Sequence, residues 1–239
     1  GKDILGNSYT AVALTTANGL TQDIKIGGVQ QYGASKPHYM GPAIIAKGET
    51  EGRPATPVRV EFYNLLPTTD AGGDLFIPVD TTIMGSGMAP DGTMYSQNRA
   101  TVHLHGTDTV WISDGTPHQW ITPAGEQTNY PQGVSVYAVP DMGIVDNGSE
   151  TDGKMTFYYT NQHSARLMFY HDHSYGITRL NVYVGEAAPY IVMDEVEKDL
   201  INGTNNTGVN PGFATFLPDI GIPLVIQDKT WVDANTILN

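Results

Sequence analysis

Short segments of alternating apolar and polar residues, separated by turn-forming clusters, most restrict the fold of this chain. The clearest runs from Val58 to Asn64, and its period of two is that of a strand with one buried face. Four more segments have strand-like patterns: 101–105, 167–171, 181–185 and 190–193. The 27 Gly and 15 Pro are spread along the chain, which has almost no helical periodicity. The sequence therefore predicts an all-β protein, an antiparallel β-sandwich with many turns.

The composition of the chain changes near Asp194. Residues 194–218 join a charged stretch to a polar, turn-forming one, the composition of an interdomain linker. Beyond it, Ile222–Gln227 and Thr230–Val232 again have strand-like patterns, but no partner strands follow them. We therefore expect one domain over residues 1–193, a linker over 194–218, and the first strands of a truncated second domain over 219–239.

Charge and cysteine content exclude several classes of function. The chain has 25 acidic and 12 basic residues and a net charge of −13, whereas nucleic acid or an anionic membrane requires a basic surface. No segment approaches the roughly 18 apolar residues of a membrane-spanning helix, so we expect no membrane partner. The chain has no Cys, which rules out disulfides, thiolate metal ligands and a cysteine nucleophile within it.

Two His-X-His pairs, His103 with His105 and His171 with His173, indicate a metal site. Residues i and i+2 of a strand point to the same face, so each pair presents two imidazoles side by side. One such pair is more often a chance occurrence on an exposed strand. Two pairs, each beside bulky apolar residues, favour a metal, because histidines buried together need partners.

The residues alone leave the metal open. Four imidazoles without cysteine suit copper or zinc. A catalytic zinc site typically uses three protein ligands, so a mononuclear zinc enzyme would need only three of the four histidines. Two pairs favour more than one metal ion, and a purely structural sandwich without metal is the weakest alternative. The other histidines, His38, His118 and His163, are interpreted as surface or strand-start residues.

The local sequences resemble those of a known family. Thr101–Gly106 and Tyr170–Ser174 resemble the two N-terminal copper motifs of multicopper oxidases, in the bacterial branch of spore-coat laccases and bilirubin oxidases. Gly41–Ile45, Gly176–Gly185 and Ile222–Asp228 extend the resemblance over nearly the whole chain. It implies a cupredoxin-like Greek-key β-sandwich, normally the first of three, followed here by the start of a second cupredoxin domain.

The resemblance also implies roles for individual residues. In the family, a trinuclear copper cluster lies between the first and last domains, and each contributes two His-X-His pairs. His103 would ligate the type 2 copper, and His105, His171 and His173 the type 3 pair. Asp114 stands where related oxidases carry an acid implicated in proton delivery to oxygen, although Ser-Asp-Gly is also an ordinary turn.

Asp172 lies between two of the expected ligands. A carboxylate there could orient imidazoles by hydrogen bonding. Its side chain, however, should point away from the flanking histidines, because neighbouring residues of a strand face opposite sides.

By this resemblance the chain is the N-terminal portion of a laccase-like oxidase. It would supply half the trinuclear copper ligands for four-electron reduction of O2 to water, coupled to one-electron oxidation of a substrate. Without Cys it cannot form the type 1 copper site. The C-terminal cupredoxin domains would supply that site and bind the reducing substrate, a phenol, a pigment or a metal ion. The alternative is a non-catalytic copper carrier or storage domain. An extracellular or cell-envelope location fits the family.

Overall fold

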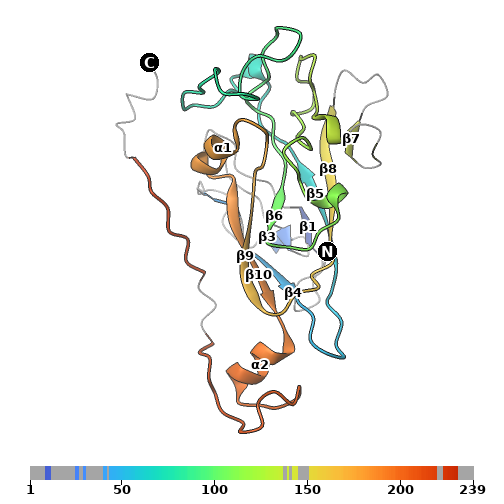
Figure 1. Ribbon diagram of the computed structural model, residues 1–239, viewed down its shortest axis with the longest axis vertical. Coiled ribbons are helices and arrows are strands. Elements are labelled where there is room, and N and C mark those ends of the chain that lie inside the picture. Colours follow the sequence, from blue (N-terminus) through green and yellow to red (C-terminus); the bar gives the residue numbers. More distant parts are fainter. Residues whose placement is uncertain are drawn as a thin grey trace.

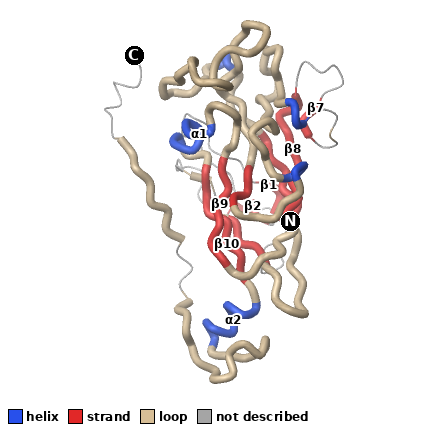
Figure 2. The backbone as a smooth tube through the Cα atoms, viewed as in Figure 1, coloured by secondary structure: helices blue, strands red, loops and turns tan. Residues whose placement is uncertain are grey.

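Two β-sheets face each other across an apolar core at the centre of the molecule (Figure 1). The computed structural model of this 239-residue chain describes residues 9–11, 25–26, 29–30, 40–41, 43–136, 139, 142–144, 151–219 and 223–230. Loops make up much of the described chain, and the short helices lie outside the sheets (Figure 2).

The first sheet brings together segments that are far apart in the sequence. Its strands, in spatial order, are β4 (Ile44–Lys47), β10 (Ala187–Met193), β9 (Arg166–His171) and β6 (His103–His105). β10 runs parallel to β4 and antiparallel to β9, and β6 is antiparallel to β9. Both histidine pairs therefore lie on, or directly after, the two adjacent strands at one edge of this sheet.

The second sheet is antiparallel and pairs strands rich in β-branched and aromatic residues. Its order is β5 (Val58–Tyr63), β8 (Thr151–Tyr159) and β7 (Met142–Ile144). A small third sheet contains β1 (Tyr9–Ala11), β2 (Lys25–Ile26) and β3 (Val29–Gln30). The helices are η1 (Thr69–Ala71), η2 (Trp111–Ser113), η3 (Val134–Val136), α1 (Thr178–Val184) and α2 (Glu195–Asn202).

The core lies between the first two sheets and is built from alternate residues of their strands. The first sheet contributes Ala46, Leu104, Met168, Tyr170, Ala188, Tyr190 and Val192, and the second contributes Phe62, Met155, Phe157 and Tyr159. Burial of each large apolar side chain contributes about 1.5–3 kcal/mol. The predicted all-β sandwich is confirmed, and so are the expected strands at 58–63, 103–105, 167–171 and 190–193. The expectation of a purely antiparallel arrangement is wrong at one point, because β10 and β4 run parallel.

The strand expected at residues 181–185 is wrong, because Thr178–Val184 forms the helix α1. Gly185 ends this helix with φ of 117°, and its N–H donates to the carbonyl oxygens of Asn181 and Val182. Asn181 is buried, and its amide bonds to residues outside the helix. Alternation over five residues cannot distinguish a strand from one turn of helix held by distant hydrogen bonds.

The start of the expected linker is more regular than its composition indicated. Asp194 caps α2 by accepting a hydrogen bond from the Glu197 backbone N–H, so the expected linker opens with a helix. Its role as a linker and the domain boundaries stay predictions.

The strand expected at Ile222–Gln227 is not borne out where the structure describes it. Residues 223–230 adopt no regular structure, and Ile226 is 96% exposed. A strand forms only against a hydrogen-bonding partner. Residue 222 and residues 231–232 of the second expected strand lie outside the described part.

Within the described part of the chain, no helix has the length and apolar character needed to cross a membrane.

Asp194 is expected to be a measurable source of stability. Its second oxygen accepts from the Ala165 N–H at 2.9 Å, which ties α2 to the segment leading into β9. Asp194→Ala removes both bonds and should lower the free energy of unfolding by about 1–2 kcal/mol in urea. Asp194→Asn keeps a capping oxygen and should lose less. Equal stability of Asp194→Ala and the unsubstituted chain would contradict this assignment.

Candidate metal centre

The structure brings the four imidazoles of the two His-X-His pairs together. In the antiparallel register of β6 and β9, His103 stands opposite His171 and His105 opposite Phe169. His173 lies just beyond the end of β9. The ring of His103 is 4.9 Å from that of His173, 5.4 Å from that of His171 and 5.5 Å from that of His105, measured between centroids. One strand pairing thus gathers side chains from segments about seventy residues apart.

Backbone carbonyls fix the orientation of two of the imidazoles. His103 Nδ1 lies 2.6 Å from the Asp114 carbonyl oxygen, and His171 Nδ1 lies 2.5 Å from that of Asp172. A carbonyl only accepts, so each Nδ1 carries the proton and each Nε2 keeps its lone pair. His105 Nδ1 lies 3.2 Å from His171 Nε2. Two imidazole nitrogens face each other there, a geometry satisfied by one shared proton or by a cation.

The donor set fits a nitrogen-preferring metal such as copper. Ligand atoms of His103, His105 and His171 all lie within 4.8 Å of one another. The Nδ1 atom of His173 is buried and has no hydrogen-bond partner among the described residues. A buried polar atom left unpaired is costly, and a metal ion would satisfy it. Neutral imidazoles without carboxylates or thiolates suit copper or zinc, as the sequence predicted.

Burial keeps the His171 imidazole neutral. The pKa of His171 is lowered from the usual 6.5 to about 4, and desolvation by burial is the largest cause. The Asp172 carbonyl opposes this shift, and the other three imidazoles contribute to it. At neutral pH this ring is therefore neutral, with one nitrogen free of a proton, which a metal ligand requires.

Asp114 borders the cluster through both its backbone and its side chain. It follows η2, and its Oδ1 atom lies 3.5 Å from His103 Nδ1. The carbonyl oxygen, at 2.6 Å, is the nearer partner. Asp114 therefore orients His103 mainly through its backbone, and its role in proton delivery stays a prediction.

The side chain of Asp172 points away from the imidazoles, and the residue lies just beyond β9, which ends at His171. Its carboxylate is buried and accepts hydrogen bonds from three other residues, none of them a histidine. Only its backbone carbonyl meets His171. Glu186 lies near it, and burial followed by the charge of Asp172 raises the pKa of the Glu186 carboxyl well above its ordinary value.

The face of the sheet that carries the histidines is apolar and partly open. The Phe169 ring stacks on the rings of His105 and His171, at 4.7 Å and 5.2 Å between centroids. The strand registers place further apolar residues on this same face: Ile45, Leu167, Pro189 and Ile191. Leu167 is 58% exposed, and Phe169 and Ile45 are each 44% exposed. Sequence reasoning missed this surface, although the continuous apolar residues of 187–193 are typical of a strand covered on both faces.

The remaining histidines take the ordinary roles expected where they are described. His163 Nε2 accepts a hydrogen bond from the backbone N–H of Asp108 at 3.3 Å and contacts the Thr107 hydroxyl at 3.1 Å. It thereby holds the loop that follows the first histidine pair. His118 is exposed, and His38 lies outside the described residues.

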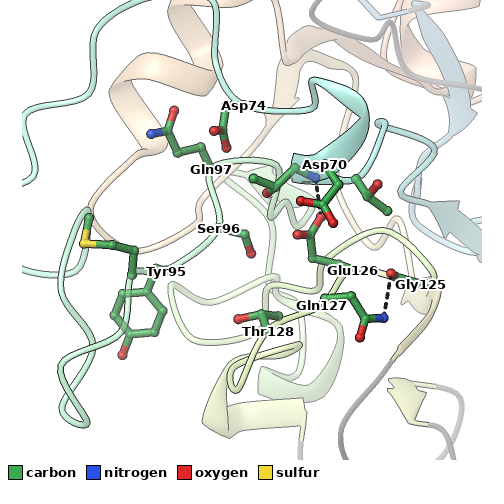
Figure 3. Close-up of a pocket in the computed structure, with 12 residues that line it drawn as sticks. Asp70, Asp74, Tyr95, Ser96, Gln97, Gly125, Glu126, Gln127 and Thr128 are labelled. Atoms are coloured by element: carbon green, nitrogen blue, oxygen red, sulfur yellow. Dashed lines mark hydrogen bonds between the residues drawn. The ribbon is translucent and has the colours of Figure 1, made fainter.

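A separate cavity of about 310 Å³ lies away from the histidine strands (Figure 3). Asp70, Asp74 and Glu126 line it together with Tyr95 and Gln97. Burial, and then the charge of Glu126, raise the pKa of Asp74. None of its lining residues belongs to β6 or β9, so this cavity is not the candidate metal centre.

Comparison with known proteins finds relatives among copper oxidases. The chain is 31% identical to the laccase of Bacillus subtilis over 192 residues, which are 80% of this chain and 28% of that laccase. It is 32% identical to the laccase of Bacillus stratosphericus over 177 residues, 73% of this chain and 26% of that protein. It also matches the bilirubin oxidase of Albifimbria verrucaria, at 33% identity over 37% of this chain and 13% of that enzyme. The chain thus spans little more than a quarter of the length of these two laccases.

Solved structures give a weaker likeness. The multicopper oxidase McoA of Aquifex aeolicus matches at 18% identity with a TM-score of 0.38, over 82% of this chain and 28% of McoA. No model of a known protein family matches the chain.

The lowered pKa of His171 predicts a pH-dependent stability of the metal-free chain. Between pH 6.5 and about 4, the His171 imidazole binds a proton in the unfolded chain but not in the folded chain. Its contribution to stability is therefore full above pH 6.5 and is lost as the pH falls toward 4. Urea unfolding of the chelator-treated chain should show a smaller loss over this window in His171→Asn than in the unsubstituted chain.

The exposed His118 provides the control for this experiment. His118→Asn should leave the pH dependence unchanged. An identical pH profile for His171→Asn and the unsubstituted chain would contradict the expected burial of a neutral imidazole.

Proposed function

Because the chain belongs to the multicopper oxidase family, we propose that it is the N-terminal portion of a laccase-like oxidase and supplies half the ligands of a trinuclear copper cluster. The observation that carries the proposal is the convergence of four imidazoles from two His-X-His pairs on one face of a sheet. By the family resemblance, His103 would hold the type 2 copper, and His105, His171 and His173 the type 3 pair.

The chain's own residues bind and orient the metals. Bound copper would supply the electrons that reduce O2 to water. The carbonyls of Asp114 and Asp172 hold two imidazoles with Nε2 unprotonated, so these rings need no proton release to bind metal. The ring of Phe169 stacks on those of His105 and His171 and so covers one side of them.

A second set of ligands is expected to come from outside this chain. The histidine face of the sheet exposes Phe169 beside His105, which is itself exposed, and also exposes Leu167 and Ile45 farther along the same face. Apolar surface around half-exposed ligands is typical of a face covered by another domain. The chain has no Cys, so the type 1 copper and the reducing substrate, a phenol, a pigment or a metal ion, belong to the C-terminal cupredoxin domains.

Asp114 is the candidate for proton delivery. Reduction of O2 to water consumes protons, and a carboxylate near the site can hold and pass them. Its Oδ1 atom lies within 3.5 Å of His103 Nδ1, and its side chain is 30% exposed, so it contacts both the cluster and solvent.

A copper carrier or storage domain is the second candidate. It is favoured by the fact that four histidines of one chain already converge without the thiolate that electron entry requires. Such a protein would bind copper and consume no O2, alone or with its neighbouring domains.

Substitution of the ligands in the full-length oxidase tests the proposal. His105→Ala or His171→Ala should reduce O2 consumption to background, because each removes one imidazole from a shared cluster. His118→Ala, at an exposed histidine outside the cluster, should retain the original rate when measured with an oxygen electrode. Retained turnover in either cluster variant would overturn the proposal, and copper binding without any O2 consumption would favour the carrier.

A further inference from the structure

The carboxylate of Asp172 uses its full capacity to accept hydrogen bonds. The residue is 2% exposed. Its Oδ1 accepts from the Thr101 N–H at 2.9 Å and from the Ser174 hydroxyl at 2.7 Å. Its Oδ2 accepts from the Ser174 N–H at 2.9 Å and from the Asn181 amide at 3.0 Å. These four hydrogen bonds join Thr101, Ser174 and Asn181 to one another through a single buried side chain.

Two of the three donor residues stand close to the histidine pairs in the sequence. Thr101 precedes His103 by two residues, and Ser174 follows His173. The ladder between β6 and β9 covers only three residue pairs, from His103 opposite His171 to His105 opposite Phe169. His173 lies beyond that ladder. The Asp172 carboxylate therefore continues the connection between the two segments past the point where backbone pairing ends.

A buried polar network extends from Asp172 to the surrounding loops. The Asn181 amide also donates to the Arg99 carbonyl at 3.3 Å. Burial lowers the pKa of the Arg99 guanidinium to about 10, and the nearby Asp172 opposes this shift. That guanidinium donates to the carbonyl oxygens of Gly85, Ser96 and Tyr175. The Asp172 carboxylate is thus connected through Asn181 and Arg99 to the loops that contain Gly85, Ser96 and Tyr175.

We infer that Asp172 is a positioning residue, whose carboxylate fixes the spacing between the two His-X-His pairs and so sets the ligand geometry of the metal site. The inference rests on the proposed function, since it assumes that these imidazoles bind copper. Asp172 touches no imidazole with its side chain and acts through the backbone that carries them. Loss of such an outer partner typically weakens metal binding by about 10–100-fold.

Asp172→Asn tests the role with almost no change of shape. The amide keeps one acceptor oxygen, but its NH2 group faces two donors that had been bonded to the second oxygen. Titration of the 239-residue chain with Cu²⁺ should show at least about tenfold weaker binding. The Cu²⁺ electron paramagnetic resonance spectrum should also change, because the imidazoles no longer meet at the original spacing.

Asp91→Asn is the matched control. Asp91 Oδ1 likewise accepts from the backbone N–H and the hydroxyl of the residue two positions on, Thr93, at 3.0 Å and 2.7 Å. This motif lies in an exposed loop away from β6 and β9. Asp91→Asn should keep both the copper affinity and the spectrum of the unsubstituted chain.

A second variant keeps the test decisive if Asp172→Asn does not fold. Ser174→Ala removes one of the four hydrogen bonds and should weaken Cu²⁺ binding several-fold with a smaller spectral change. Unaltered affinity and spectrum in a folded Asp172→Asn or Ser174→Ala variant would overturn the positioning role while leaving the proposed function in place. Copper binding by the unsubstituted chain that is insensitive to His171→Ala would overturn both.

Discussion

The pairing of β6 with β9 is the interaction on which the rest of the site depends. It spans three residue pairs, yet it places His103 directly opposite His171. Side chains alternate along a strand, so this one register sends both histidine pairs to the same face. A slip by one residue would turn one pair into the core and replace it with Leu104 or Tyr170, which are buried there. The apolar core between the sheets and the ligand geometry therefore enforce the same register.

The first sheet is apolar on both of its faces, and only one of them is covered by the second sheet. Tyr190 and Val192 are buried in the core, whereas Leu167 and Phe169 lie on the opposite face beside the imidazoles. This asymmetry leaves the imidazoles of the candidate metal site held on one side and partly exposed on the other. On the core side, backbone carbonyls orient the rings and the Asp172 network connects the segments that carry them. On the other side, the imidazoles lie on a partly exposed apolar face.

Local pattern in the sequence was sufficient to predict the sandwich, most strands and the gathering of the histidines, because periodicity and the His-X-His spacing are properties of neighbouring residues. It failed where distant hydrogen bonds decide the outcome. Residues 181–185 alternate like a strand, but buried bonds from Asn181 and the left-handed Gly185 hold them in a helix. The partners of Asp172 come from residues 101 and 181, which no local pattern connects. Residues 223–227 have a strand-like sequence and no partner among the described residues to make them a strand.

The central claim is that the four imidazoles form one copper-binding centre. Crystals of the chain soaked in Cu²⁺, with anomalous diffraction recorded at the copper edge, test it most directly. The account predicts anomalous density within bonding distance of the Nε2 atoms of His103 and His171, with His105 and His173 completing the ligand set. Copper bound elsewhere, for example at the acidic cavity lined by Asp70, Asp74 and Glu126, with none at the histidines, would contradict it.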